Sequence, residues 1–215
     1  MLCIIKNEDC LVSMAKLPAG CVDLTVTSPP YDDLRTYKGY TFDFESVAKG
    51  LYRVTKPGGV VVWVVGDATI KGSETGTSFR QALYFKEIGF NIHDTMIWEK
   101  TGQGAVGSKY SYWQNFEYMF VFSKGKLTTF NPIEDRQNKV VGEKPTIGQR
   151  RKDGTHSGKR DITRKELGKR FNLWKINQET KGEHPAPFPE SLANDHIVSW
   201  SNEGDLVYDP FLGSG

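Results

Sequence analysis

The stretch Val22-Asp23-Leu24-Thr25-Val26-Thr27-Ser28-Pro29-Pro30-Tyr31 decides the fold. Its first six residues are mostly β-branched or apolar and have the length of a buried strand. The two prolines that follow fix φ and lack an N–H, so the chain cannot continue a central strand or enter a helix interior. We therefore expect the chain to leave the sheet in an extended turn. Because ligands of open α/β sheets bind beyond the carboxyl ends of strands, this turn is a candidate site.

Short apolar runs alternate with helical periodicity along most of the remaining chain. The run Val60–Val65 is continuously apolar, which is typical of a strand buried on both faces. Further strands are predicted at Leu2–Ile5, Asn91–Glu99, Phe116–Ser123 and Asp205–Tyr208, and helices over Cys10–Leu17, Phe44–Val54, Ser78–Glu87 and through Leu192 and Ile197. This alternation predicts an α/β sheet that is covered by helices on both faces.

Length and composition exclude several classes of protein. At 215 residues the chain fits one domain, 1–215, with a modest insertion. Its longest apolar run, Val60–Val65, is far shorter than the roughly 20 residues of a membrane span. The start of the chain lacks the pattern of a secretion signal, so we expect a cytoplasmic protein. The three cysteines and four histidines show no metal-ligand spacing, so no metal is expected.

Positive charge gathers in one segment. Residues 124–181 hold 16 Lys and Arg against 7 Asp and Glu, although the whole chain has a net charge of only +2. From about 124 to 170 no apolar face emerges, which predicts an insertion. Such a layout suits contact with a polyanion, and Arg150-Arg151-Lys152 are candidates for phosphate contacts. A solvated basic loop remains an equally open reading.

A second motif follows the last predicted strand. In Asp209-Pro210-Phe211-Leu212-Gly213-Ser214-Gly215, the glycines permit close approach of the backbone to a ligand. In the first motif, Tyr31 offers a flat face on which an extruded base could stack. Either motif alone is more often only a turn.

Together, Ser-Pro-Pro-Tyr early and Asp-Pro-Phe-Leu-Gly-Ser-Gly late resemble the amino-methyltransferases of restriction–modification systems, in the permuted order where the catalytic motif precedes the cofactor motif. The resemblance extends over nearly the whole chain. It includes Asn7-Glu8-Asp9, Arg53–Gly59, Phe116–Lys124, Trp174-Lys175-Ile176 and His184–Glu190.

The resemblance implies a Rossmann-like S-adenosylmethionine-dependent methyltransferase fold that acts on double-stranded DNA. Contacts to S-adenosyl-L-methionine would come from Asp9, Phe188, Asp209, Phe211, Gly213 and Gly215. The catalytic corner would be Ser28, Pro29, Pro30 and Tyr31. The insertion at 124–170 would be the target-recognition region, and a cognate restriction endonuclease a further partner.

The target base depends on one residue. In this family Ser before Pro-Pro-Tyr usually goes with N4 of cytosine, and Asp or Asn with N6 of adenine. Ser28 therefore favours cytosine-N4, with adenine-N6 as the alternative. A carbon-5 methyltransferase would need a Pro-Cys nucleophile, and none of the three cysteines follows a proline.

The end of the chain adds a further alternative. In the family the glycine motif leads into more of the sheet, so the chain is expected to be a domain truncated at the C-terminus. A catalytically silent DNA-binding remnant is then the second hypothesis, and an RNA or protein methyltransferase the third. Tyr110, Tyr112 and Trp113 either stack on DNA or pack internally.

Overall fold

A six-stranded mixed sheet organises the protein, in the order β11-β5-β6-β2-β1-β12. Neighbouring strands are parallel except around β6, which runs antiparallel to both β2 and β5. The strands are β1 Val22–Thr27, β2 Thr55–Val65, β5 Asn91–Thr101, β6 Phe116–Ser123, β11 Leu173–Asn177 and β12 Val207–Tyr208. The other five strands therefore end at the edge of the sheet where β6 begins.

This computed structural model describes residues 3–30, 42–101, 109–142, 146–148, 150–156, 160–161, 163–178 and 189–213. The chain divides into two compact units. The sheet unit comprises Met1–Asn131 and Asn172–Gly215, and the insert unit comprises Pro132–Phe171.

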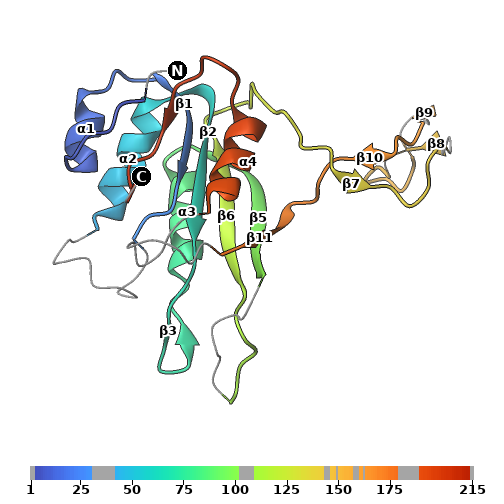
Figure 1. Ribbon diagram of the computed structural model, residues 1–215, viewed down its shortest axis with the longest axis horizontal. Helices are drawn as coiled ribbons and strands as arrows, with labels where there is room; N and C mark the ends of the chain where they lie inside the picture. Colours follow the sequence, from blue (N-terminus) through green and yellow to red (C-terminus); the bar gives the residue numbers. More distant parts are fainter. Residues whose placement is uncertain are drawn as a thin grey trace. The chain divides into compact units, whose positions relative to one another are not determined.

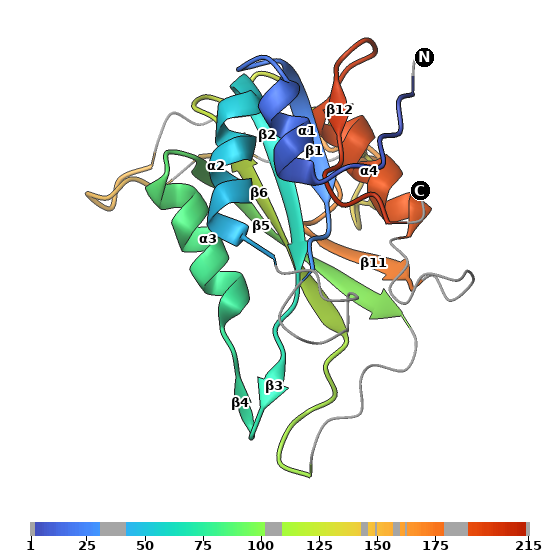
Figure 2. The ribbon, with the colours of Figure 1, turned by 90° about the vertical axis from the view of Figure 1, so that its left-hand side faces the viewer.

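Helices cover both faces of the sheet (Figures 1 and 2). The helices α1 Cys10–Lys16, α2 Phe44–Val54 and α3 Thr77–Glu87 share one core cluster, and α4 Glu190–Trp200 belongs to the cluster of the other face. The α2 helix forms there because its apolar residues recur at helical spacing and bury one stripe against the core. This stripe consists of Val47, Ala48, Leu51 and Val54. The Asp43 side chain caps the amino end of α2 by accepting the Ser46 N–H at 3.1 Å.

The β2 strand lies between the two cores, as its continuous apolar run predicts. Val61, Trp63 and Val65 belong to the core beneath α1, α2 and α3. Val60, Val62 and Val64 belong to the core beneath α4. Since successive side chains of a strand point to opposite faces, only an unbroken apolar run can serve both cores.

Short hairpins complete the structure. In the sheet unit, β3 Thr69–Ile70 pairs with β4 Ser73–Glu74. In the insert unit, β7 Arg136–Gln137 pairs with β10 Leu167–Gly168, and β8 Thr146–Ile147 pairs with β9 Arg160–Asp161. The described strands of the insert unit are therefore two-residue ladders, in agreement with its lack of an apolar pattern.

The expected strand at Leu2–Ile5 is wrong. Residues 3–5 form no strand, and Ile4 and Ile5 are 66% and 71% exposed, while Leu2 lies outside the described residues. Among the described residues no strand pairs with this segment, and its side chains stay exposed, so its apolar pattern alone does not make it a strand.

The other predicted strands and helices are confirmed. The β2 strand begins at Thr55, ahead of the apolar run from Val60, because the backbone of Thr55 already pairs with Val22 of β1. The remaining predicted ends differ from the observed ones by at most two residues. The fold is mixed α/β.

Candidate active site

The double-proline corner follows β1 directly. Thr27 is the last residue of the strand and is 1% exposed, with Trp63 of β2 as its neighbour in the parallel register. Ser28 and Pro30 are half-buried and Pro29 is buried, and none of the three belongs to a strand or helix. The chain thus leaves the sheet where the prolines predict. Tyr31 lies outside the described residues.

The glycine motif lies beside this corner. The β12 strand pairs in parallel with β1, so that Tyr208 is opposite Thr25. Just beyond this pair, the Thr27 hydroxyl donates a hydrogen bond of 2.6 Å to Asp209 Oδ1. The two motifs are 182 residues apart in sequence and meet through this bond.

The bend after β12, residues 209–213, is called the glycine bend and is organised by the same carboxylate. Asp209 Oδ1 also accepts the Phe211 N–H at 2.9 Å, which closes a tight turn. Protein packed around the carboxyl group raises the pKa of Asp209, and the bonds from Thr27 and Phe211 oppose this rise. Asp209 nevertheless remains exposed as a residue, so a ligand can reach it. Gly213 has a φ of +66°, a backbone conformation that favours glycine, whereas Gly215 lies outside the described residues.

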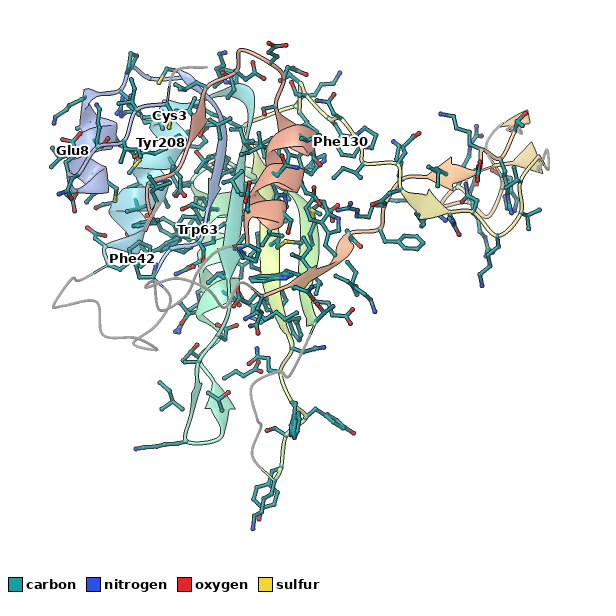
Figure 3. All side chains as sticks on the ribbon, viewed as in Figure 1. Cys3, Glu8, Phe42, Trp63, Phe130 and Tyr208 are labelled. Carbon is teal, nitrogen blue, oxygen red and sulfur yellow. The ribbon has the colours of Figure 1, made fainter. Side chains whose placement is uncertain are left out.

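An aromatic cluster lies beneath the bend. The Phe211 ring lies 5.4 Å from that of Phe42 and 6.4 Å from that of Trp63. Trp63 is fully buried, and its indole N–H donates to Gln81 Oε1 at 2.9 Å. Phe211 therefore anchors the bend to the core, and Figure 3 shows Phe42 and Trp63 close together on the same side of the sheet.

Asp9 has a structural role at the start of α1. Its Oδ1 accepts the N–H of Leu11 at 2.8 Å and of Val12 at 3.4 Å, and it is exposed.

Burial raises the pKa of Tyr208 to about 12, and the negative charges of Asp209 and Glu8 act in the same direction. The acidic segment before α1 therefore lies near the bend. A cofactor role for Asp9 stays a prediction, and Phe188 lies outside the described residues.

Sequence reasoning missed Asp67, which follows the carboxyl end of β2. Asp67 is 7% exposed and accepts hydrogen bonds from the Ser78 N–H at 2.9 Å, from the Ser78 hydroxyl and from the Thr75 hydroxyl. It thereby ties the end of β2 to the start of α3. An acid two residues after a buried strand, at the edge where ligands bind, is the signal that could have found it.

The basic triplet lies in a tight turn of the insert unit. Arg150, Arg151 and Lys152 are all exposed. The backbones of Arg150 and His156 form an isolated antiparallel β-bridge, and the Arg151 N–H donates to the Thr155 carbonyl at 2.6 Å. The three cations are therefore presented to solvent by a hydrogen-bonded turn.

The described part of the chain holds neither a metal cluster nor a membrane span. Over those residues, no group of three or more His, Cys, Asp or Glu is placed to hold a metal ion. No helix there is long and apolar enough to cross a membrane.

Comparison with known proteins gives a consistent result. A family profile described as DNA methylase, of the N6/N4 methyltransferases, matches residues 22–215. The orphan methyltransferase M.BamHII of Bacillus amyloliquefaciens is 61% identical over 206 residues, which cover 90% of this chain and 77% of that protein. The chain spans 60% to 65% of the length of three further curated methyltransferases.

Solved structures agree on the fold. The cytosine-N4-specific PvuII DNA methyltransferase superposes with a TM-score of 0.65 at 21% identity, over 94% of this chain and 71% of that one. TTHA0409 of Thermus thermophilus, assigned as a DNA modification methylase and solved with S-adenosyl-L-methionine, superposes with a TM-score of 0.59 at 25% identity, over 94% of this chain and 75% of that one. The family match over residues 22–215 and the 61% identity together lead to one conclusion: this chain belongs to the N6/N4 DNA methylase family.

Proposed function

We propose that this chain transfers a methyl group from S-adenosyl-L-methionine to the exocyclic N4 amino group of cytosine in double-stranded DNA. The observation that carries the proposal is the hydrogen bond of 2.6 Å from the Thr27 hydroxyl to Asp209. It holds the double-proline corner next to the glycine bend. A base held by the first and a methyl donor held by the second would lie within reach of each other.

The corner suits the chemistry of an exocyclic amino group. The nitrogen lone pair of such a group is delocalised into the ring, which makes it a poor nucleophile. Pro29 and Pro30 have no N–H, so the carbonyls of Ser28 and Pro29 can accept hydrogen bonds from the amino group without competition from those positions. These bonds favour a pyramidal nitrogen whose lone pair points out of the ring. Positioning by a rigid, packed corner then supplies much of the rate.

The bend suits the proposed cofactor. S-adenosyl-L-methionine supplies an electrophilic methyl group on a cationic sulfonium. The bend offers Asp209, which is exposed as a residue although protein packs around its carboxyl group, and main chain made accessible by Gly213 with its φ of +66°. Phe211 fixes the bend to the aromatic cluster, so this part of the site is preorganised. TTHA0409, at 25% identity, was solved with the same cofactor.

The choice of cytosine rests on Ser28, because a hydroxyl both donates and accepts and can serve the N3 edge of cytosine. The test is methylation of unmethylated plasmid DNA, followed by mass analysis of the digested nucleosides. We expect N4-methylcytosine. N6-methyladenine would overturn the base assignment, and absence of any methylated nucleoside would overturn the proposed activity.

A pair of variants tests the corner itself. Ser28→Ala should lower transfer by about 100-fold or more, the scale of losing one well-placed catalytic hydrogen bond. Ser28→Thr keeps a hydroxyl and should retain more activity. Both should bind S-adenosyl-L-methionine like the wild type in calorimetry. A wild-type rate in Ser28→Ala would contradict the role given to Ser28.

A further inference from the structure

The segment before β6 has no role in holding the target base or the methyl donor. We call Lys109–Asn115 the aromatic loop. Its last residue is held on β5, because the Asn115 carbonyl accepts the Lys100 N–H at 2.6 Å. Its aromatic side chains are exposed: Tyr110 by 85%, Tyr112 by 99% and Trp113 by 59%. Three large exposed aromatics within four residues mark a binding surface.

The aromatic loop lies at the edge of the sheet that carries the double-proline corner. In the register, Thr27 of β1 neighbours Trp63, and Val65 of the same β2 strand neighbours Tyr118 of β6. Two strand spacings, about 10 Å, thus separate β1 from β6 across the sheet, and β6 begins four residues from Phe120, the residue level with Thr27. Figures 1 and 2 show the loop, in yellow-green, projecting from this edge alongside the β3–β4 hairpin.

Other exposed aromatics of the described residues have partners. The Phe79 ring lies 5.2 Å from that of Tyr118, Phe130 stacks on Trp200 at 4.9 Å, and Arg136 lies 4.7 Å over Phe171. Tyr112 and Trp113 differ: within the described part of the chain, neither has a ring, cation or hydrogen-bond partner. Their rings are free to contact another molecule.

We propose that the aromatic loop is a DNA-contacting surface, on which Tyr112 and Trp113 stack against the bases beside the extruded target nucleotide. The inference rests on the proposed function in taking DNA as the substrate. Stacking on aromatic rings accepts any base, because every base presents a flat face. Lys109, whose ammonium lies 4.8 Å from the Tyr110 ring, is the only charged residue of the loop and suits the phosphate backbone.

The tryptophan fluorescence of the protein gives a direct test. Of the five tryptophans, Trp63, Trp98, Trp174 and Trp200 are at most 5% exposed, so Trp113 dominates the emission that acrylamide can quench. Saturating unmethylated plasmid DNA should protect this emission severalfold. Trp113→Phe should remove the quenchable component in the free protein. Unchanged quenching with DNA bound would overturn the proposal.

Variants test the same surface in catalysis. The double variant Tyr112→Ala/Trp113→Ala should raise the KM for DNA by about tenfold or more, the factor for one lost stacked base. Tyr112→Phe and Trp113→Phe keep the rings and should stay within about twofold of the wild type. Leu83→Ala removes a comparably exposed side chain from α3, 63% exposed, and serves as the matched control. A double variant with a wild-type KM would contradict the inference.

The two proposals fail in different ways. If the wild type methylates DNA but Trp113 stays equally quenchable, the aromatic loop does not contact DNA and the proposed function stands. If the wild type transfers no methyl group, the proposed function fails. Protection of Trp113 by DNA then still supports the contact surface, and lack of protection overturns it as well.

Discussion

Thr27 and Asp209 are joined by a hydrogen bond of 2.6 Å between the ends of two neighbouring parallel strands, β1 and β12. The Thr27 side chain is almost fully buried, at 1% exposure, and its hydroxyl is a donor to a carboxylate. Such bonds to charged groups are stronger than neutral ones. The Thr27 hydroxyl therefore adds a strong contact to the strand pairing that aligns the two motifs.

Thr27→Val should uncouple the corner from the bend. Loss of a hydrogen bond to a charged group should cost about 1–3 kcal/mol of unfolding free energy. Cofactor affinity should fall as well, because the Asp209 turn loses one of its two donors. Urea unfolding and calorimetry with S-adenosyl-L-methionine measure both effects. Thr27→Ser keeps the hydroxyl and should lie closer to the wild type; equal losses in the two variants would argue against the hydrogen bond as the cause.

Thr25→Val is the matched substitution two residues earlier on the same strand, and the opposite outcome is expected. Thr25 is 0% exposed, and among the described residues its hydroxyl has no hydrogen-bond partner. Replacing an unpaired buried hydroxyl with a methyl group of the same shape should leave stability unchanged or raise it by about 1 kcal/mol. A clear fall in the midpoint of urea unfolding would mean that the Thr25 hydroxyl has a partner.

Asp67→Ala should destabilise the link between β2 and α3. The Asp67 carboxylate accepts the Ser78 N–H near the amino end of α3, and Gly76, at the capping position, offers no side-chain cap. We expect a loss of about 1–3 kcal/mol, since a helix-start N–H loses its acceptor. Urea unfolding measures it, with Glu74→Ala on the exposed β4 strand as the control. Equal stability of the two variants would contradict the role of Asp67.

His196 should make stability depend on pH. It is 0% exposed, and burial lowers its pKa to about 3. The Trp200 indole N–H donates to His196 Nδ1 at 3.3 Å, so the neutral ring carries its proton on Nε2, which faces the Met119 sulfur at 3.2 Å.

The unfolded chain binds a proton to this histidine near pH 6.5 and the folded chain only near pH 3. Its contribution to stability is therefore full above about pH 6.5 and is lost as the pH falls towards 3, at up to about 1.4 kcal/mol per pH unit. Urea titrations between about pH 7 and 4 measure the slope across this window. His196→Gln should flatten it relative to the wild type, and an unchanged slope would assign the effect to other groups.

The basic turn of the insert unit should contribute to DNA affinity without choosing a sequence. Replacing Arg150, Arg151 and Lys152 by Ala should weaken binding similarly for all DNA sequences. It should also reduce the slope of the logarithm of the binding constant against the logarithm of the salt concentration by about one per lost phosphate contact. Fluorescence anisotropy over a salt series measures the change. A triple variant at Lys49, Arg80 and Lys86, on α2 and α3, removes equal charge and is the control. Equal slopes in both triple variants would argue for bulk charge alone.

Local pattern predicts most elements, and tertiary context decides the rest. The helix Phe44–Val54 and the strands Val22–Thr27 and Phe116–Ser123 have the ends that their patterns predict, because the periodicity is complete within each segment. The prediction at Leu2–Ile5 is wrong because an apolar run forms a strand only beside a partner. Capping by Asp9 and bridging by Asp67 also involve neighbours that periodicity does not reveal.

The sequence predicts the site as two motifs, but not the contact between them. Thr27 precedes the double proline and Asp209 opens the glycine motif, yet only the parallel pairing of β1 and β12 brings them into hydrogen-bond distance. The exposure of Tyr112 and Trp113 argues against internal packing, one of the two readings that the sequence leaves open, and their stacking on DNA stays a prediction.

The reversed direction of β6 has a consequence for how such an enzyme diversifies. Parallel strands return through a crossover, so their connections must travel the length of the sheet. The turn between β5 and β6 instead begins and ends at the same rim. Residues added or exchanged there leave the pairing of every strand intact, so this part of the rim can change while the scaffold is preserved.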